Sequence, residues 1–336
     1  MKKWKVLLLS FLISGLLLMG LTSFAETKPV KSISIFYIVK ASNSFYWQIV
    51  MNGAQLAAKD LGVQITFQEA LAESDVAQQV SILNDAIALH PDAIIIAPTV
   101  ADALVPGIEQ AMSQGIKVIL IDSAANTQDY VSFLSTNNVQ AGKDLAKEFV
   151  DLIKAKTGQA NPTGNIAYMT SMAGVGSLTQ RDQGFLEGLK EYGPGLTIVA
   201  HQYAQNSIDT ATTNWENIFT ANPNLVGVFA DNNVTGDGLA RALQLSGMAG
   251  KVVAVAFDND PAEIDALSSG ILQALQIQQP WIMGYWSVFY AVSAVEGVGG
   301  LPKNVDTGAF IATKANMNTA EGQAILNPIE FHKNWK

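Results

Sequence analysis

Carboxylate side chains recur directly behind apolar segments of this sequence. Four aspartates lie just past such segments: Asp122, Asp231, Asp258 and Asp260. Arg181 lies early in the predicted helix that follows Gly176. Carboxylate and guanidinium groups form charge-assisted hydrogen bonds with hydroxyl groups, which suits a polyhydroxylated, uncharged ligand. An aspartate can instead cap a helix, and we expect this role for Asp260 because Pro261 follows it. For Asp122 and Asp258 the spacing leaves both roles open.

A second candidate stretch extends from Lys40 to Gly62 and carries three consecutive aromatic residues, Phe45, Tyr46 and Trp47. The preceding Ser-Asn-Ser, residues 42–44, predicts a helix start whose free N–H groups the side chains can cap. Successive helical residues point about 100° apart, so the three rings cannot all face one core stripe. An aromatic face beside a polar turn suits a sugar ring. The alternative is that Phe45 and Tyr46 belong to the core.

Signatures of catalysis and of metal binding do not appear in the sequence. Gly174 and Gly176 form a Gly-x-Gly, but no third glycine completes a dinucleotide fingerprint, and no Walker, GxSxG or HExxH motif is found. The sequence contains no cysteine, and its three histidines lie far apart. Paired acids could serve a glycosidase, but no such pair is identifiable. We therefore expect no enzyme activity, no catalytic residue, no metal and no cofactor.

The N-terminus has the organisation of a secretory signal peptide. Three lysines within residues 1–5 precede an apolar run, and Ser23 and Ala25 occupy the two positions that a signal peptidase reads. We expect cleavage after Ala25 and a periplasmic protein, with an uncleaved membrane anchor as the alternative. Because no cysteine is present, attachment through a lipidated cysteine is not expected.

Charge and length narrow the class of protein further. Without the three N-terminal lysines, 17 basic residues face 29 acidic ones, a net charge of about −12. Such a surface disfavours nucleic acid as a partner. The roughly 310 residues that would remain after cleavage suggest two domains.

Short β-branched runs alternate with amphipathic stretches as far as about Gly300. This alternation predicts parallel sheets with helices on both faces, an α/β fold. Runs such as AIIIAP are apolar on both sides of the pleat, as buried parallel strands are. The expected strands are Ile33 to Val39, Val63 to Gln68, Ala93 to Ala97, Lys117 to Ile121, Tyr130 to Leu134, Asn165 to Thr170, Thr197 to Ala200, Leu225 to Ala230, Lys251 to Phe257 and Ile271 to Ile277.

The expected helices fall between these strands, and the carboxyl ends of the strands should form the ligand site. Residues 157–164 are interpreted as a surface loop, and a domain boundary is expected near Ser135 and Thr136. The expected helices are Asp75 to Leu89, Ala101 to Gln114, Val139 to Lys156, Leu178 to Tyr192, Ile208 to Thr220, Thr235 to Ser246 and Pro261 to Ser269.

The mature chain resembles, essentially end to end, the type I periplasmic sugar-binding proteins of ABC transporters, the group that includes ribose-binding protein. The order and spacing of the matching stretches carry the resemblance: SNSFYWQIVMNGAQLAAKDLG, DAIIIAPT, GIKVILIDS, QRDQGFLEGL, ANPNLVGVFADNN, GLARALQLSG, VVAVAFDNDP and VDTGAFIATKAN. The resemblance implies two doubly wound parallel-sheet lobes joined by a three-stranded hinge. Residues 26–135 with 279–306 would form the N-terminal lobe, and 136–278 with 307–336 the C-terminal lobe.

The resemblance also implies a set of ligand-binding residues. Ring-stacking aromatics correspond to Phe45, Tyr46 and Trp47, and Lys40 lies where some relatives have a ligand-contacting lysine. The hydrogen-bonding set corresponds to Asn43, Asp122, Arg181, Asn232, Asp258 and Gln278. The sequence departs from the ribose pattern at Ser123, where ribose binders have an arginine, at Asn233, which replaces an aspartate, and at Gln205, near a second stacking aromatic.

The function implied is capture of a monosaccharide or related polyol in a cleft between the lobes and delivery to a membrane ABC permease. A sensory receptor that hands a sugar-like signal to a chemoreceptor or kinase, and a secreted glycosidase, are the alternatives. A repressor of the same fold is disfavoured because no helix-turn-helix precedes Ile33. The protein is expected to be a monomer that closes on its ligand.

Overall fold

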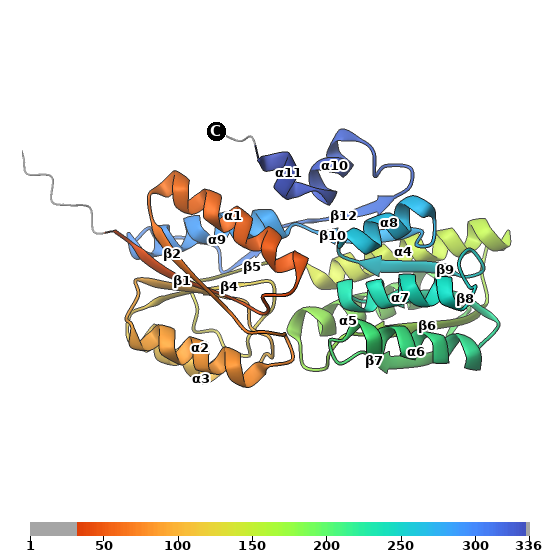
Figure 1. Cartoon of the computed structure of the whole chain (residues 1–336), viewed down its shortest axis with the longest axis horizontal. Helices are drawn as coiled ribbons and strands as arrows, with labels where there is room; N and C mark the ends of the chain where they lie inside the picture. The colour runs from red at the N-terminus through yellow and green to blue at the C-terminus, as the bar shows by residue number, and fades with distance from the viewer. Residues whose placement is uncertain (1–31, 334–336) are drawn as a thin grey trace, which may run out of the picture. The chain divides into compact units, whose positions relative to one another are not determined.

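A computed structural model describes residues 32–333 of the chain, of which residues 33–333 belong to one compact unit beginning at Ile33. The predicted signal peptide, residues 1–25, lies outside the described residues. Within the described range, no helix has both the length and the apolarity needed to cross a bilayer. The unit contains two six-stranded sheets, each with helices on both faces (Figure 1).

The first sheet has the strand order β11-β5-β4-β3-β1-β2, and every neighbouring pair in it is parallel. Side chains of α1 and α9 pack on one face, and those of α2 and α3 pack on the other. The elements are β1 (Ser34–Val39), α1 (Phe45–Leu61), β2 (Gln64–Glu69), α2 (Val76–Ala88), β3 (Ala93–Ile96), α3 (Val105–Ser113), β4 (Lys117–Ile121), β5 (Ser132–Ser135), α9 (Pro280–Val295) and β11 (Asn304–Asp306).

The second sheet has the order β12-β10-β9-β8-β6-β7, in which only the β10–β12 pair is antiparallel. Helices α4 and α5 cover one face, and α6, α7 and α8 cover the other. The elements are α4 (Asn138–Thr157), β6 (Gly164–Thr170), α5 (Gly176–Tyr192), β7 (Leu196–Tyr203), α6 (Ile208–Ala221), β8 (Leu225–Ala230), α7 (Asn233–Leu245), β9 (Val253–Phe257), α8 (Pro261–Ser269), β10 (Ala274–Gln278) and β12 (Ala309–Thr313).

The chain passes between the two sheets three times, from β5 to α4, from β10 to α9 and from β11 to β12. We call the first sheet with its helices the first lobe, and the second sheet with its helices the second lobe. The predicted fold, two doubly wound lobes joined by three crossings, is confirmed. The residue boundaries proposed for the lobes remain a proposal. Strand β3 is buried along its whole length, as the run of isoleucines predicts.

Several predicted boundaries were displaced, and the reasons are local. Predicted strands began at Lys251 and Ile271, but β9 and β10 begin two and three residues later. Residues Ile271 and Leu272 instead donate backbone hydrogen bonds to Ala266, which completes the end of α8 at the left-handed Gly270. Helix α3 begins at Val105 rather than Ala101, with Pro106 in its first turn.

The C-terminal elements were not predicted. Helix α9 is apolar almost all round and carries no clear single stripe, which is typical of a buried helix rather than an amphipathic one. Two short helices, α10 (Ala320–Leu326) and α11 (Pro328–His332), follow β12. Leu326 of α10 belongs to the core of the second lobe, whereas His332 of α11 stacks on Trp281 of α9 at 3.7 Å.

Candidate functional site

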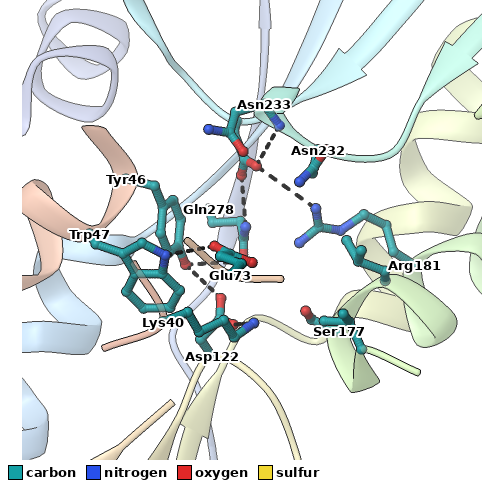
Figure 2. A pocket seen from close by; sticks show the side chains of 13 residues that line it. Lys40, Tyr46, Trp47, Glu73, Asp122, Ser177, Arg181, Asn232, Asn233 and Gln278 are labelled. Atoms are coloured by element: carbon teal, nitrogen blue, oxygen red, sulfur yellow. Dashed lines mark hydrogen bonds and ion pairs between the residues drawn. The ribbon is translucent and has the colours of Figure 1, made fainter. Parts of the chain in front are cut away.

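A polar cavity lies where strand ends of the two lobes face each other (Figure 2). The enclosed free space is about 30 Å³, and about 340 Å³ when space open to solvent is included. The smaller volume has room for only one or two water molecules. The cavity is lined by Lys40, Tyr46, Trp47, Glu73, Asp122, Val175, Ser177, Leu178, Arg181, Asn232, Asn233, Asp258 and Gln278.

An ion pair forms the wall of the cavity in the first lobe. Lys40, just after β1, places its Nζ 2.6 Å from Asp122 Oδ2 and 2.6 Å from Ser123 Oγ. Burial by itself would raise the pKa of Asp122, but the charge and hydrogen bond of Lys40 hold it below its usual value. Asp122 also has a φ of 61°, a left-handed conformation that is costly for a residue with a Cβ. Such strain is typical of functional positions.

Two of the three consecutive aromatic residues of α1 reach the cavity. Tyr46 and Trp47 are buried and meet edge to face at 5.0 Å between ring centroids. The Tyr46 hydroxyl donates to Asp122 Oδ1 over 3.0 Å, and burial followed by the Asp122 charge raises the pKa of Tyr46. Lys40 Nζ lies 5.5 Å from the Trp47 ring centroid. Phe45, the first of the three, does not line the cavity.

Glu73 is a cavity residue that sequence reasoning missed. It lies in the loop after β2, and its Oε1 accepts a hydrogen bond from Trp47 Nε1 over 2.7 Å. Burial raises the pKa of Glu73, and the charge of Lys40 opposes that rise. No cap pattern marks this loop position in the sequence. Its place in the cavity depends on the contact with Trp47, which lies on a separate element, α1.

Arg181 forms the wall of the cavity in the second lobe. Its Nε and Nη2 donate to Asn138 Oδ1 over 3.3 and 3.0 Å, and Nη1 donates to the Asp231 carbonyl over 2.5 Å. The guanidinium carbon lies 4.0 Å from the Phe257 ring centroid. These contacts fix a side chain that is only 1% exposed. Protein contacts alone thus hold the arginine in place.

Close packing of α4 on α5 makes this arginine geometry possible. A Cβ at Gly184, in the Arg-x-x-Gly-Phe pattern, would lie 1.9 Å from the carbonyl oxygen of Val139. A Cβ at Gly142 would lie 2.3 Å from the carbonyl oxygen of Arg181. Glycine is required at both positions because the two helices approach each other too closely for any side chain.

Asp258, the counterpart of Asp122, has a different set of partners. Its Oδ1 accepts from Gln278 Nε2 over 2.7 Å, and its Oδ2 accepts from the Asn233 N–H over 3.1 Å. Arg181 Nη1 is 4.0 Å from Asp258 Oδ2. Burial raises the pKa of Asp258 more than Arg181 lowers it. Asp258 shares the left-handed conformation of Asp122, with a φ of 81°.

Direct hydrogen bonds join the lobes beside the cavity. The hydroxyls of Ser123 and Ser177 are 2.9 Å apart, and the Tyr46 hydroxyl lies 3.5 Å from Gln278 Oε1. Ser123 therefore lies behind Asp122 and contacts the other lobe, and it is not among the residues lining the cavity.

The remaining predicted site residues lie elsewhere. Asn43 is exposed and lines a neighbouring hollow with Ser44 and Glu73, and Gln205 is exposed outside the cavity. Ser44 is the N-cap residue of α1, but its side chain makes no capping hydrogen bond, so that prediction was wrong. Asp260 is the N-cap residue of α8, as predicted. Asn232, Asp258 and Gln278 line the cavity as expected.

The chemistry of the cavity is that of recognition. Within residues 32–333, no group of histidine or acidic side chains has the arrangement of a metal site. Two cationic side chains, Lys40 and Arg181, face three carboxyl groups, those of Glu73, Asp122 and Asp258. Amide and hydroxyl groups between them can donate and accept at once. Such a lining suits an uncharged ligand with many hydroxyl groups.

Comparison with known proteins places the chain among solute-binding proteins. The periplasmic binding protein domain family matches residues 35–298. A carbohydrate transporter solute-binding protein from Agrobacterium radiobacter, solved with D-arabinose, is 40% identical, with a TM-score of 0.85, covering 89% of this chain and all of that one. An ABC transporter solute-binding protein from Agrobacterium vitis with bound D-fucose is 34% identical, with a TM-score of 0.82, covering 87% of this chain and 99% of that one. The ribose import binding protein of Salmonella typhimurium is 26% identical over 83% of this chain and 90% of its own length.

Proposed function

Because this chain belongs to the periplasmic binding protein family, we propose that it captures a neutral monosaccharide in the interlobe cavity and delivers it to an ABC importer. The observation that carries the proposal is the convergence on one cavity of Asp122 from the first lobe with Arg181 and Asp258 from the second. Each group is buried and held in place by neighbours, so hydroxyl groups of a sugar would meet a preorganised set of partners. The relatives named above bind or import sugars, which supports the same ligand class.

The three chain crossings between the lobes can act as a hinge, so we infer that binding involves opening and closing of the lobes. The cavity lies between the lobes and is lined by residues of both, so we infer that the ligand enters when they separate. Hinge closure around a ligand is established for periplasmic binding proteins. A sugar shifts the balance toward the closed form only through its preferential affinity for that form. Contacts to both lobes supply this preference, since they are complete only when the lobes meet.

The ligand class can be narrowed by the sugars bound to the two solved relatives described above, which are 40% and 34% identical to this chain, whereas the relatives solved with D-tagatose and D-allose are 28% and 26% identical. D-Arabinose is a pentose and D-fucose a 6-deoxyhexose, so neither carries a hydroxyl group at C6. We therefore propose that a neutral sugar of this size is the ligand, in preference to a hexose with a 6-hydroxyl.

Isothermal titration of residues 26–336 with D-arabinose, D-fucose and D-galactose tests this proposal. One of the first two sugars should bind at one site per chain, and at a hundredfold excess over Kd it should add about 2.7 kcal/mol of stability. Arg181→Ala should abolish binding, whereas Arg241→Ala, in an exposed ion pair with Asp209, should leave it unchanged. Silence with all three sugars would exclude this ligand class.

Membership of the same family also supports proposals about the export of this protein and its non-enzymatic role. We expect export through the signal peptide, cleavage after Ala25 and a monomeric, non-enzymatic protein in the periplasm. Mass spectrometry of the exported protein should give an N-terminus at Glu26. Release of chromophore from aryl glycosides would contradict the non-enzymatic role and favour a glycosidase.

A further inference from the structure

A second, larger cavity lies on the second lobe, outside the interlobe cavity. It is a groove of about 420 Å³ between helix α5 and strands β6 and β7. Strand β7 is at the edge of its sheet, and most of its residues are exposed. The groove thus has a solid wall and floor and one side open to solvent, and its volume is in the range of ligand-binding sites.

Three rings form the strand side of the groove. Tyr168 of β6 is paired in register with His201 of β7, and the two rings stack at 4.0 Å with planes 7° apart. Tyr203 follows two residues later on the same face, 4.8 Å from the His201 ring. Tyr203 is 47% exposed. Within residues 32–333, neither tyrosine hydroxyl has a hydrogen-bond partner. An exposed aromatic platform with free hydroxyl groups is therefore available to a ligand.

A short hydrogen-bond chain lies beneath these rings. Thr170 Oγ1 is 2.5 Å from Asp182 Oδ2 and 2.9 Å from His201 Nε2. Thr170 has only one hydroxyl proton, so if it donates to Asp182, the ring of His201 must donate to Thr170. His201 Nδ1 is then an acceptor. If Asp182 carries the proton, it donates to Thr170, Thr170 donates to His201 Nε2, and His201 Nδ1 becomes a donor. Nδ1 can therefore either donate to a ligand hydroxyl or accept from one.

The carboxyl group of Asp182 supplies the second polar element. Its Oδ1 is buried and has no hydrogen-bond partner among residues 32–333. Burial raises the pKa of Asp182 to about 7, so the group is partly neutral under physiological conditions. A buried polar atom without a partner is uncommon and costs free energy. A ligand hydroxyl that reached Asp182 would remove that cost.

The charges at the rim indicate the class of ligand. Glu187 and Lys190 project from α5 at the edge of the groove and carry opposite charges. With Asp182 partly neutral, the groove attracts neither anions nor cations strongly. Aromatic faces together with groups that donate and accept suit a neutral saccharide, whose C–H faces stack on rings. We propose that this groove is a second saccharide-binding site, which takes a terminal sugar unit of a neutral oligosaccharide.

The open side of the groove distinguishes it from the interlobe cavity. The latter encloses its ligand and can take only a single sugar, whereas a groove along an edge strand allows a chain to continue into solvent. Residues 172–174 line the groove, and Val175 and Ser177 of the next turn line the interlobe cavity. Binding in the groove therefore contacts the loop that also shapes the interlobe cavity, and it does not depend on which sugar that cavity takes.

Nuclear magnetic resonance titration of the ¹⁵N-labelled mature protein tests the proposal, with maltose, cellobiose and lactose as probes. At least one should shift amide signals of residues 168–174, 182–190 and 201–203, with a Kd on the order of 1 mM. The shifts should also occur when the interlobe cavity is saturated with D-arabinose. Adventitious binding would instead shift signals scattered over the surface, and this outcome would overturn the proposal.

Two substitutions on β7 supply the matched comparison. Tyr203→Ala should weaken disaccharide binding about tenfold or more. Gln202→Ala changes the next residue, which is also exposed but points to the opposite face, and should leave the Kd unchanged. Tyr203 is exposed, so its loss should not unfold the protein. The proposal would also be overturned if no amide signal of the groove shifted with any disaccharide at about 50 mM, fiftyfold above the expected Kd, or if the two substitutions had equal effects.

Discussion

Asp122 and Asp258 occupy equivalent places in the two lobes but differ in their electrostatics. Each follows the third strand of its sheet, β4 or β9, and each has a left-handed backbone. Asp122 forms a direct ion pair with Lys40 at 2.6 Å, whereas Asp258 bonds to neutral amides and lies 4.0 Å from Arg181. Consequently the pKa of Asp122 falls and that of Asp258 rises.

The difference follows from how the two cations are held. The flexible Lys40 side chain carries a compact charge that reaches Asp122 directly. The guanidinium of Arg181 is committed to Asn138 and the Asp231 carbonyl, which keep it away from Asp258. The first lobe thus holds its aspartate in a direct ion pair, whereas the second lobe leaves Asp258 without a hydrogen-bonded cation. Equivalent positions in a duplicated architecture can therefore divide stability and recognition between them.

The largest expected effect separates the two aspartates by stability. Asp122→Asn removes the hydrogen-bonded counter-charge of the buried Lys40 and should lower the free energy of unfolding by about 3–5 kcal/mol. Asp258→Asn should change it by less than about 1 kcal/mol, because its hydrogen-bond partners are neutral amides and the Gln278 amide can rotate to donate or accept. Arg181, 4.0 Å away, keeps its hydrogen bonds to Asn138 and to the Asp231 carbonyl. Urea denaturation of both variants measures the difference. Equal losses would show that the two carboxylates play the same role.

A smaller effect should appear when the arginine loses its support. Asn138→Ala frees two N–H groups of Arg181 and should weaken sugar binding about tenfold, since a misplaced guanidinium no longer matches the hydroxyl groups. Titration calorimetry with the sugar that binds the wild type gives the ratio. Asn138→Asp keeps an acceptor oxygen and should retain most of the affinity.

Asn304→Ala, at an exposed strand position, is the control for this prediction. If Asn138→Ala lowers the melting temperature but leaves the sugar Kd unchanged, Asn138 is structural and does not position the arginine.

The smallest expected effect is a dependence of stability on pH that arises in the second lobe. Burial raises the pKa of Asp182 and of Asp237 to about 7, well above the unfolded value near 3.8. Between pH 8 and 6.5 the folded state therefore takes up protons that the unfolded state does not, so stability should increase on acidification by up to about 0.8 kcal/mol per group. The lowered pKa of Asp122 acts in the opposite sense, but only below about pH 4, where its stabilisation is lost.

Urea denaturation at pH 8 and pH 6.5 measures this dependence. Asp182→Asn should reduce the increase, whereas Asp151→Asn, at an exposed surface pair, should not. A protein that becomes less stable between pH 8 and 6.5 would contradict the assignment of raised pKa values to these carboxyl groups.

Local patterns predicted much of the fold and part of the site. Apolar runs identified every strand from β1 to β10, and four polar residues at or near their ends line the cavity, namely Lys40, Asp122, Asp258 and Gln278. Their role in ligand binding stays a prediction. The pattern did not distinguish among Phe45, Tyr46 and Trp47, because a helix can be rotated so that either neighbouring pair faces inward. The contact of Trp47 with Glu73 selects the orientation.

By itself, the sequence determined the α/β class and the strand ends on which the aspartates lie. These properties depend on neighbours a few residues away, so composition and periodicity reveal them. Only the tertiary structure decided that Asn138 holds Arg181, that Glu73 enters the cavity and that Ser123 contacts the other lobe. Each of these contacts joins residues at least 26 positions apart, and the packing of whole lobes brings them together. The same holds for the groove beside β7. Tyr168 lies 33 residues before His201 and 35 before Tyr203 in the chain, and the three rings gather there because β6 and β7 pair in parallel.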